Sequence, residues 1–418
     1  MAFWAMFSAM FWLYIAVASN AAVGTVNTLI GMTLTIVTYG LINSVLSRHA
    51  IKTGQTISLF SKEIFGSVGS GLAALLFAVT AIYYAVFEGS IIAVALQEYF
   101  GGNLKLWYLV VVLYAIPLVA GGVQNWLDKL NGVLLPLYVL GLAAIVIGAT
   151  VKQGYPTDWL THTVAAGPLP GWLNSYLIYM GVWVMMMYTF EFARLGKPSD
   201  AKFHGTVTFG WVFYALTFGL NGLIGIYLVS AWNLDSTETG IVTAIINSLG
   251  IFGVIVIVIS QTRINTANYY SASSNLQDLA TLISGKTTSR FLWVLVSGVV
   301  AYLFMLTDVL SYLLRALAWQ GVFVTAWVAI ALASLYFTNR RGIARADASK
   351  PIARQGLSAL GWPVVAWVAS SGLGIALTEQ AALPVVASLA PIITVVVAVG
   401  LYLPAAKKAD FRHIGAAS

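Results

Sequence analysis

The chain has no cysteine and very little charge. Charged residues make up 8% of its 418 residues, whereas hydrophobic residues make up 60%. Without cysteine, neither a disulfide framework nor a thiolate site can form. Soluble domains carry roughly 25% charged residues, so this composition excludes an ordinary soluble protein. The four histidines are scattered over predicted loops, which argues against a zinc site, and no cofactor is expected. They are His49, His162, His204 and His413.

Long apolar runs recur from one end of the chain to the other. A membrane-crossing helix needs about 20 apolar residues, and these runs are continuous rather than alternating, which favours helices over a β-barrel. We therefore predict an all-α polytopic membrane protein with about twelve transmembrane helices. The third and eighth spans are longer than a straight crossing needs. The predicted spans are 3–25, 28–46, 70–98, 105–122, 131–150, 172–192, 206–230, 251–279, 290–306, 309–337, 360–378 and 383–403.

The loop charges predict the orientation of the chain in the membrane. If the N-terminus is cytoplasmic, nearly all loop Lys and Arg residues fall inside, and only Lys105 and Lys152 fall outside. This bias predicts cytoplasmic termini, and we expect a bacterial inner membrane protein. The net charge of +7 then reflects topology, so a nucleic-acid partner is not expected.

The eighth span turns polar without stopping, in the run SQTRINTANYYSASSN at 260–275. On a helix, Gln261, Asn265 and Asn268 share one face and Arg263 lies roughly opposite. Amides and a guanidinium at membrane depth usually mark a substrate or ion path.

The segment before this span decides how deep Arg263 lies. Ser236 or Thr237 can cap a short external helix over 239–249, which would bury Arg263. If 233–250 instead began the eighth span, Arg263 would only snorkel to the cytoplasmic interface.

A carboxylate lies within the third span, surrounded by aromatic residues. Glu88 at this depth must be paired or protonated, because burial disfavours its charged form. Its role is either proton coupling and substrate contact or a structural partnership with a buried group. Tyr84 and Glu88 share a helix face, as do Tyr83 and Phe87. A flat heterocycle needs an aromatic surface and polar groups that read its edge.

Other charged pairs border the spans. Glu191 and Arg194 lie three residues apart at the end of the sixth span and can pair. Asp308 and Arg315 share a face near the tenth span, so we expect a structural or gating pair. Trp183 lies in the middle of the sixth span. In the first span, the small and polar residues of 16–25 allow either close helix approach or local unwinding.

Three segments carry motifs that together match a known family. The loop 52–70 has a Thr-Gly…Ser-Lys…Phe-Gly…Gly-Ser pattern, 191–194 has an acidic-aromatic-x-Arg motif, and 262–268 ends in Ala-Asn. With these motifs the chain resembles the nucleobase–cation symport family of cytosine, purine, uracil, allantoin and hydantoin permeases. The resemblance covers nearly the whole chain.

The resemblance implies two inverted five-helix repeats plus two extra helices. The first repeat is expected over 1–150 and the second over 151–337, followed by a basic cytoplasmic linker, two helices and the tail over 338–418. A midplane site is implied between spans one, three, six and eight. Because the family's N-terminal tail is missing here, the natural start is expected upstream.

Site residues carry over from the family by position. Tyr83 or Tyr84 would stack on the base with Trp183, Asn268 would read its edge, and Phe87 or Glu88 occupies the family's span-three amide position. The implied substrate-binding set is Tyr83, Tyr84, Phe87, Glu88, Trp183, Asn265 and Asn268.

The sodium site of the family is altered in this chain. Sodium-coupled members use two adjacent hydroxyl residues of span eight and carbonyls of span one, but these span-eight positions are Thr262 and Arg263 here. A fixed guanidinium repels Na⁺ and can donate to span-one carbonyls near Ala16 and Asn20. We therefore predict sodium-independent transport, with Glu88 coupling the substrate to a proton.

The expected function is import of a nucleobase or related heterocycle by alternating access. An amino-acid or amine transporter of the same fold is one alternative, and Glu88 then favours an amine. An integral-membrane enzyme is another, but such chemistry commonly needs clustered carboxylates, His or Cys. The expected partners are the heterocycle, a proton and the bilayer, with an undefined oligomeric state.

Overall fold

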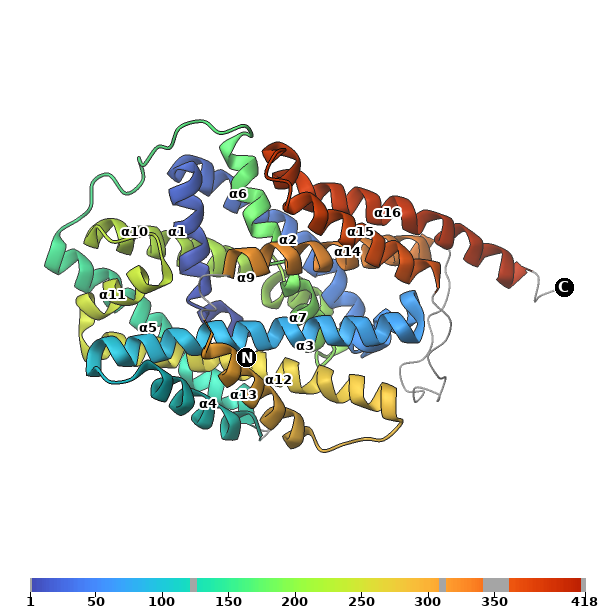
Figure 1. The fold of residues 1–418 in the computed structure, drawn as a ribbon, viewed down its shortest axis with the longest axis horizontal. Helices are drawn as coiled ribbons and strands as arrows, with labels where there is room; N and C mark the ends of the chain where they lie inside the picture. Colours follow the sequence, from blue (N-terminus) through green and yellow to red (C-terminus); the bar gives the residue numbers. More distant parts are fainter. Residues whose placement is uncertain (1, 121–125, 308–312, 341–360, 415–418) are drawn as a thin grey trace.

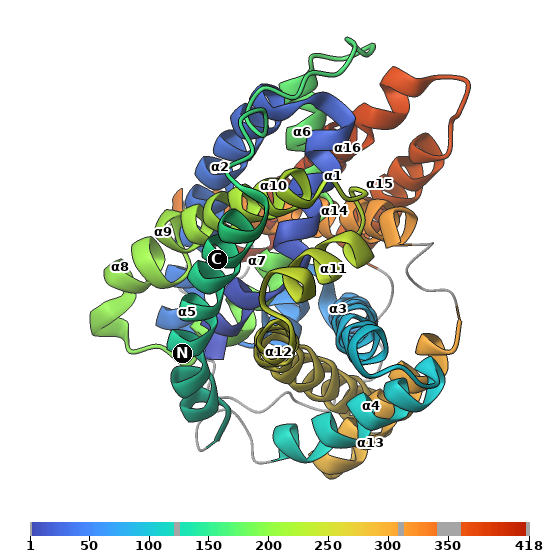
Figure 2. The same cartoon turned by 90° about the vertical axis from the view of Figure 1, so that its left-hand side faces the viewer.

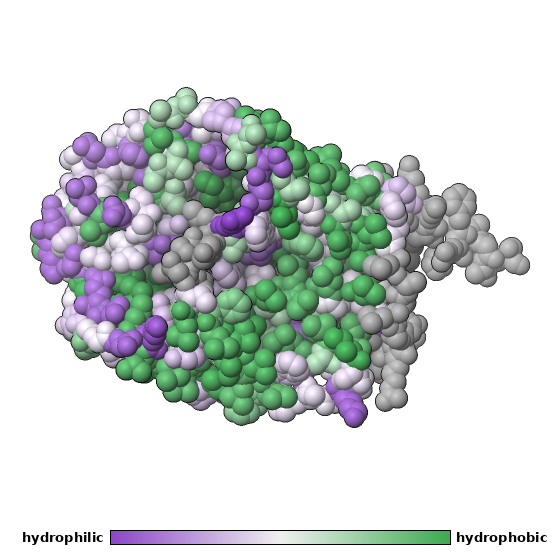
Figure 3. All heavy atoms as spheres, in the orientation of Figure 1, coloured by the Kyte–Doolittle hydropathy of each residue, from purple (hydrophilic) through white to green (hydrophobic). Residues whose placement is uncertain are grey.

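The structure, a computed structural model, describes residues 2–120, 126–307, 313–340 and 361–414. All regular secondary structure in these residues is helical. Most helices run along the long axis of the molecule, which is horizontal in Figure 1. Apolar side chains cover the middle of the molecule, and polar side chains gather at the end that carries α11 (Figure 3). This distribution fits a bilayer crossed along the long axis.

The helices follow one another with short connections. Those of the first half are η1 (Ala2–Ser8), α1 (Phe11–Val23), α2 (Thr25–Thr53), α3 (Ile57–Phe100), α4 (Leu104–Ala120), α5 (Asp128–Gln153), α6 (Gly171–Met180) and α7 (Val184–Ala193). A segmented stretch follows, η3 (Pro198–Asp200), α8 (Ala201–Phe203), η4 (His204–Thr208), α9 (Trp211–Tyr214), η5 (Ala215–Leu220) and α10 (Asn221–Trp232). The remainder are α11 (Glu238–Leu249), α12 (Ile251–Ser284), α13 (Arg290–Met305), α14 (Leu313–Arg340), α15 (Trp362–Thr378) and α16 (Pro384–Ile414).

Every predicted span coincides with helix in the described chain. Eight helical stretches are long and apolar enough to cross a membrane, and α6 with α7 forms one further span bent by 45°. The shorter apolar helices α4, α13 and α15 occupy the other predicted spans. The protein is therefore an integral membrane protein, as its composition predicts.

The long helices α3 and α12 form the centre of the fold. They have 44 and 34 residues and pack side by side along much of their length (Figure 2). α3 bends at Gly66, whose φ of 75° suits glycine. The helix begins at Ile57, where the Thr56 hydroxyl caps the Leu59 N–H. The loop expected over 52–70 is thus mostly helix, which corrects that prediction.

Two spans are broken in the middle. The first span separates into η1 and α1 at Ala9 and Met10, and the sixth separates into α6 and α7 at 181–183. Of the two alternatives for 16–25, local unwinding does not occur, because α1 is continuous to Val23. Its small residues instead allow α10 to approach, since a Cβ added at Gly222 would lie 2.9 Å from Ala16 Cβ.

The predicted external helix before span eight is present as α11. Thr237 caps it by accepting the Gly240 N–H at 3.1 Å, and Gly250 separates it from α12 with a φ of 60°. α11 packs on α3, α5, α10 and α12. Because α12 starts only at Ile251, Arg263 lies well inside it and is fully buried. The interfacial, snorkelling placement of Arg263 is therefore excluded.

The close contact of α1 with α10 can be tested at Gly225. A Cβ there would lie 2.6 Å from the Leu13 carbonyl oxygen, so we expect Gly225→Ala to destabilise the protein by about 1–3 kcal/mol. Thermal unfolding in detergent, followed by tryptophan fluorescence, measures the change. Gly372→Ala on α15 is the control, because its Cβ would meet nothing within 4 Å. Equal stability of both variants would contradict this packing.

Candidate functional site

A small closed cavity lies where the two broken spans meet α3 and α12. Its volume is about 20 Å³, which holds roughly one water molecule. Pockets for small molecules measure about 300–1,000 Å³, so the site is closed in this conformation. The lining residues are Met6, Ala9, Phe11, Trp12, Tyr84, Glu88, Val184, Met185, Tyr188, Ile264 and Asn268. The cavity combines an aromatic wall with one carboxyl group and one amide.

Three of the predicted substrate-binding residues line this cavity, namely Tyr84, Glu88 and Asn268. Asn265 lies behind them, where it accepts a hydrogen bond from the Asn268 amide at 3.3 Å and donates to the Ala85 carbonyl at 3.3 Å. Asn265 therefore orients Asn268 rather than facing the cavity.

The remaining aromatic candidates lie outside the lining. Phe87 packs edge-on against Phe11 with ring centroids 5.6 Å apart. Trp183 is buried at the break between α6 and α7 and immediately precedes α7. Neither ring forms a wall of the cavity, so the structure does not bring them into the site in this conformation.

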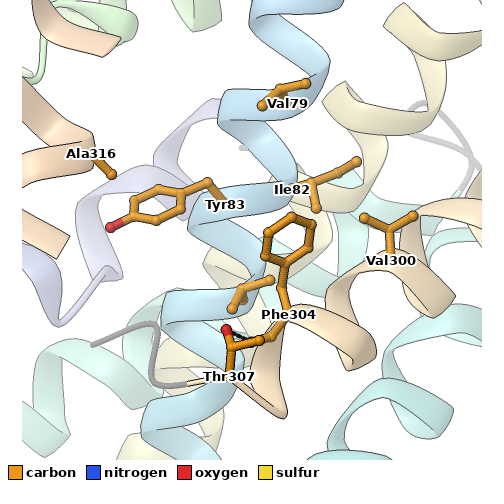
Figure 4. A pocket seen from close by; sticks show the side chains of 8 residues that line it. Val79, Ile82, Tyr83, Val300, Phe304, Thr307 and Ala316 are labelled. Atoms are coloured by element: carbon orange, nitrogen blue, oxygen red, sulfur yellow. Dashed lines mark hydrogen bonds between the residues drawn. The ribbon is translucent and has the colours of Figure 1, made fainter. Parts of the chain in front are cut away.

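Tyr83 faces a different cavity. Figure 4 shows its ring extending from α3 toward Ala316, and Phe304 and Thr307 line the same cavity. That cavity has a volume of about 410 Å³ and is lined almost entirely by apolar side chains. Of the two neighbouring tyrosines, Tyr84 lines the small cavity between the broken spans and Tyr83 lines this one.

Several lining residues were missed in the sequence. Phe11, Trp12 and Ala9 lie where η1 gives way to α1, before the segment 16–25 in which the sequence offers unwinding as one alternative. The short residues Ser8 and Ala9 between aromatic residues were the available signal. Tyr188 was also missed, although its hydroxyl donates to the Asn268 side chain at 2.7 Å. Its sequence context, a run of Met and aromatic residues, does not distinguish it from ordinary packing.

Glu88 is held by an amide of α12. Its carboxylate accepts a hydrogen bond from the Gln261 side chain, and Glu88 is 1% exposed. The other end of the same amide accepts the Met10 N–H at 3.1 Å. Gln261 therefore joins the acid of α3 to the start of α1.

The carbonyl groups at the break of span one are satisfied by side chains. Arg263 donates to the Trp4 carbonyl at 2.9 Å, Asn221 to the Phe7 carbonyl at 2.7 Å, and Ser260 to the Ser8 carbonyl at 2.5 Å. Backbone groups within a bilayer need such partners. Each of these three carbonyl groups therefore has a side-chain donor.

The predicted sodium-site positions separate in the structure. Arg263 is fully buried, reaches η1 and lies 5.9 Å above the Tyr138 ring. Thr262 instead hydrogen-bonds the Tyr114 hydroxyl on α4 at 2.8 Å. Ala16 and Asn20 lie within continuous α1, so the carbonyls near them are not the ones that Arg263 contacts. This corrects the expected location of the contact.

The inner end of the site is closed by aromatic and charged side chains. Glu191 and Arg194 form an ion pair of 3.0 Å. Phe192 packs on Tyr270 with ring centroids 5.7 Å apart, and the guanidinium of Arg290 lies 4.0 Å from the centroid of the same ring. These contacts join α7, α12 and α13 on the side expected to be cytoplasmic.

A carboxyl group of α11 contacts the first span at the outer end. Glu238 accepts a hydrogen bond from Tyr14. Burial raises the pKa of Glu238, although hydrogen bonds from its own backbone and from Tyr14 act in the opposite direction. This contact connects α11 to α1.

Arg315 has a different partner from the one expected. Asp308 lies outside the described residues, and Arg315 pairs with Glu379 at 2.6 Å. Trp319 also donates to Glu379 at 2.7 Å. The hydrogen bonds from Trp319 and Arg315 lower the pKa of Glu379. The pair is exposed, so it contributes little to stability.

Three solved transporters have the same fold as this chain. The chain matches Mhp1, a nucleobase-cation-symport-1 family transporter, in a closed conformation with bromovinylhydantoin bound. The TM-score is 0.70 and the identity 18%, over 97% of this chain and 91% of that one. A Na⁺-coupled sialic acid symporter matches with TM-score 0.63 and 16% identity, over 97% and 89%. An Eremococcus coleocola manganese transporter matches with TM-score 0.58 and 14% identity, over 96% and 92%.

These likenesses establish the fold. The chain has the fold of secondary transporters, rather than that of an enzyme, and the match to Mhp1 supports the family resemblance seen in the motifs. No protein-family model and no curated protein sequence matches the chain. At such low identity the fold leaves the substrate open, so the function must be argued from the site.

The side-chain donors to the first span can be tested at Asn221. Asn221→Leu would leave the buried Phe7 carbonyl and the Tyr138 hydroxyl without this partner, and each unpaired buried group costs about 1–3 kcal/mol. We expect a clear loss of thermal stability. Asn275→Leu is the matched control, because the Asn275 amide bonds only the Ser271 carbonyl of its own helix. If Asn221→Leu unfolds at the same temperature as this control or at a higher one, the idea that Asn221 stabilises the break in the first span is disproved.

Proposed function

We propose that the protein is a secondary active transporter that imports a nucleobase or related heterocycle by alternating access. The coupling ion is a proton, and sodium is not required. The chain functions in the inner membrane of a bacterium with both termini in the cytoplasm. The repeats proposed over 1–150 and 151–337 carry the site between them, and 338–418 lies outside this core.

The composition of the closed cavity carries this proposal. Tyr84 on α3 and Tyr188 on α7 provide flat aromatic surfaces, while Glu88 and Asn268 provide polar atoms for the edge of a ring. A carboxylate only accepts hydrogen bonds, and an amide both donates and accepts. Together they suit a heterocycle that presents N–H groups beside a carbonyl or ring nitrogen.

The contacts of Arg263 support independence from sodium. A buried guanidinium supplies a permanent positive charge next to the break in span one, and it already donates to the Trp4 carbonyl. Arginine stays protonated in proteins. Na⁺ would therefore meet both electrostatic repulsion and carbonyl groups that are already engaged.

The position of Phe11 supports alternating access. Phe11 lines the closed cavity and also a second cavity of about 320 Å³ toward the expected outer side. Phe11 therefore borders both spaces. Opening toward the outside requires movement of α1 and its Phe11 side chain, whereas opening toward the inside requires movement of η1.

The same cavity supports an organic amine as a second candidate substrate. Cations bind to the faces of aromatic rings and next to carboxylates, and Glu88 lies among Phe11, Trp12, Tyr84 and Tyr188. An amine would use Glu88 as its counter-ion, whereas a neutral heterocycle would also need Asn268. Asn268→Leu therefore distinguishes the candidates, because it should weaken heterocycle binding and spare amine binding.

Uptake into proteoliposomes tests substrate and coupling together. We expect labelled cytosine, uracil, hypoxanthine or allantoin to accumulate under an inward pH gradient, with no stimulation by a sodium gradient. Glu88→Gln should abolish the response to pH, because it removes the titrating group. Sodium-stimulated uptake by the wild type would refute the role given to Arg263. If none of these compounds nor a set of organic amines is transported, the substrate assignment fails.

Neighbouring tyrosines provide a matched pair for the stacking surface. Tyr84→Leu should weaken substrate binding about two- to tenfold, since an aromatic contact contributes roughly 0.5–1.5 kcal/mol beyond its buried area. Tyr83→Leu should leave the affinity unchanged, because Tyr83 faces the other cavity. Isothermal titration calorimetry on the purified proteins measures both dissociation constants. Similar losses in the two variants would place the substrate elsewhere.

A further inference from the structure

Gln261 connects the acid of the cavity to the movable part of the first span. Its side-chain NH₂ group donates to the Glu88 carboxylate, and its side-chain oxygen accepts the Met10 N–H at 3.1 Å. It is fully buried. Met10 precedes α1 directly. One amide therefore bridges α3 and the break of span one.

The orientation of this amide depends on the charge of Glu88. A carboxylate has only acceptors, so it requires the NH₂ end of Gln261. The oxygen end must then face Met10, whose N–H lies at the start of a helix where no intrahelical acceptor exists.

A proton on Glu88 changes this requirement. The protonated carboxyl gains an O–H donor, which the side-chain oxygen of Gln261 can accept once the amide rotates. If the amide rotates to accept this hydrogen, its NH₂ group faces the Met10 N–H, and two donors then oppose each other. The contact between α12 and the start of α1 is lost.

We propose that Gln261 transmits the protonation of Glu88 to the break in the first span and so couples the proton to the movement of α1. This inference rests on the proposed proton-coupled transport. Gln261 acts as a positioning residue: it touches the proton-carrying acid and does not line the substrate cavity.

The surroundings of Glu88 leave Gln261 as its link to the first span. The titratable groups that face Glu88 are Tyr84 on α3, Tyr188 on α7 and Tyr138 on α5. The charged Arg263 of α12 is directed to the Trp4 carbonyl of η1 instead. η1, the break and α1 contribute Met6, Ala9, Phe11 and Trp12 to the cavity, none of which titrates.

Transport measurements distinguish a role of Gln261 in proton coupling from a role in stabilising the fold. With one proton per substrate, a gradient of one pH unit supports an accumulation ratio of about tenfold. We expect Gln261→Leu to exchange substrate across the membrane but to reach a ratio of about one, because coupling is lost. Gln277→Leu is the matched control on the same helix, since its amide bonds the Thr288 carbonyl at the far end. It should accumulate substrate like the wild type.

Cysteine labelling reports the movement itself, because the chain has no native cysteine. Ala5 lies in η1 and is fully buried, so Ala5→Cys should react with a maleimide only when the inner half of the site opens. In an otherwise wild-type chain, its labelling rate should depend on pH. In Gln261→Leu that dependence should disappear. A residue that only supports the fold would change thermal stability and leave the pH dependence intact.

The outcomes distinguish this inference from the proposed function. If wild-type uptake ignores the pH gradient, proton coupling itself is refuted. If wild-type uptake follows the gradient and Gln261→Leu retains both accumulation and pH-dependent labelling, the role of Gln261 is refuted while proton coupling stands. Should Gln261→Leu fail to purify as a folded protein, Gln261→Met repeats both measurements with a side chain of similar length and flexibility. Loss of both responses in a folded variant supports the inference.

Discussion

The need to satisfy backbone carbonyl groups inside the membrane determines the arrangement of this protein. The first span is broken at Ala9 and Met10, which exposes peptide groups at a depth where water is scarce. Side chains from α12 and α10 supply the missing hydrogen bonds. The beginning of the polar run at 260–275 is therefore explained by the break that it faces, and Asn268 of the same helix lines the closed cavity.

The two faces of α12 perform different tasks. On one face, Arg263 holds η1 through the Trp4 carbonyl. On the other, Gln261 contacts Glu88, and Asn268 reaches the cavity between α3 and α7. A helix repeats every 3.6 residues, so residues two positions apart point in clearly different directions. A single helix can thus brace the break and recognise a ligand with neighbouring residues.

Local patterns predicted much of this structure, and long-range packing set the rest. The lengths of the apolar runs predicted the spans. The capping residue Thr237 predicted a separate helix, α11, and therefore the buried position of Arg263 inside the next span. The break in span one was not located from the sequence, because small residues serve close helix packing as readily as unwinding, and Ala16 serves packing. The sequence narrowed the stacking residue only to Tyr83 or Tyr84. These neighbours point in different directions from α3, and the packing of that helix decides which of them lines the cavity. The partnership of Arg315 with Glu379 joins distant helices and has no signature in either sequence segment.

The two halves of the first span are held in different ways, and this difference suits alternating access. η1 is anchored by Arg263 and Asn221, whose hydrogen bonds to the Trp4 and Phe7 carbonyls involve no carboxyl group. α1 is anchored near Met10 by Gln261, which shares its amide with Glu88. A change of charge at Glu88 therefore acts on one anchor and leaves the others intact. Because a closed cavity opens on one side only if its walls move separately, unequal anchoring of the two halves provides the asymmetry that a transport cycle needs.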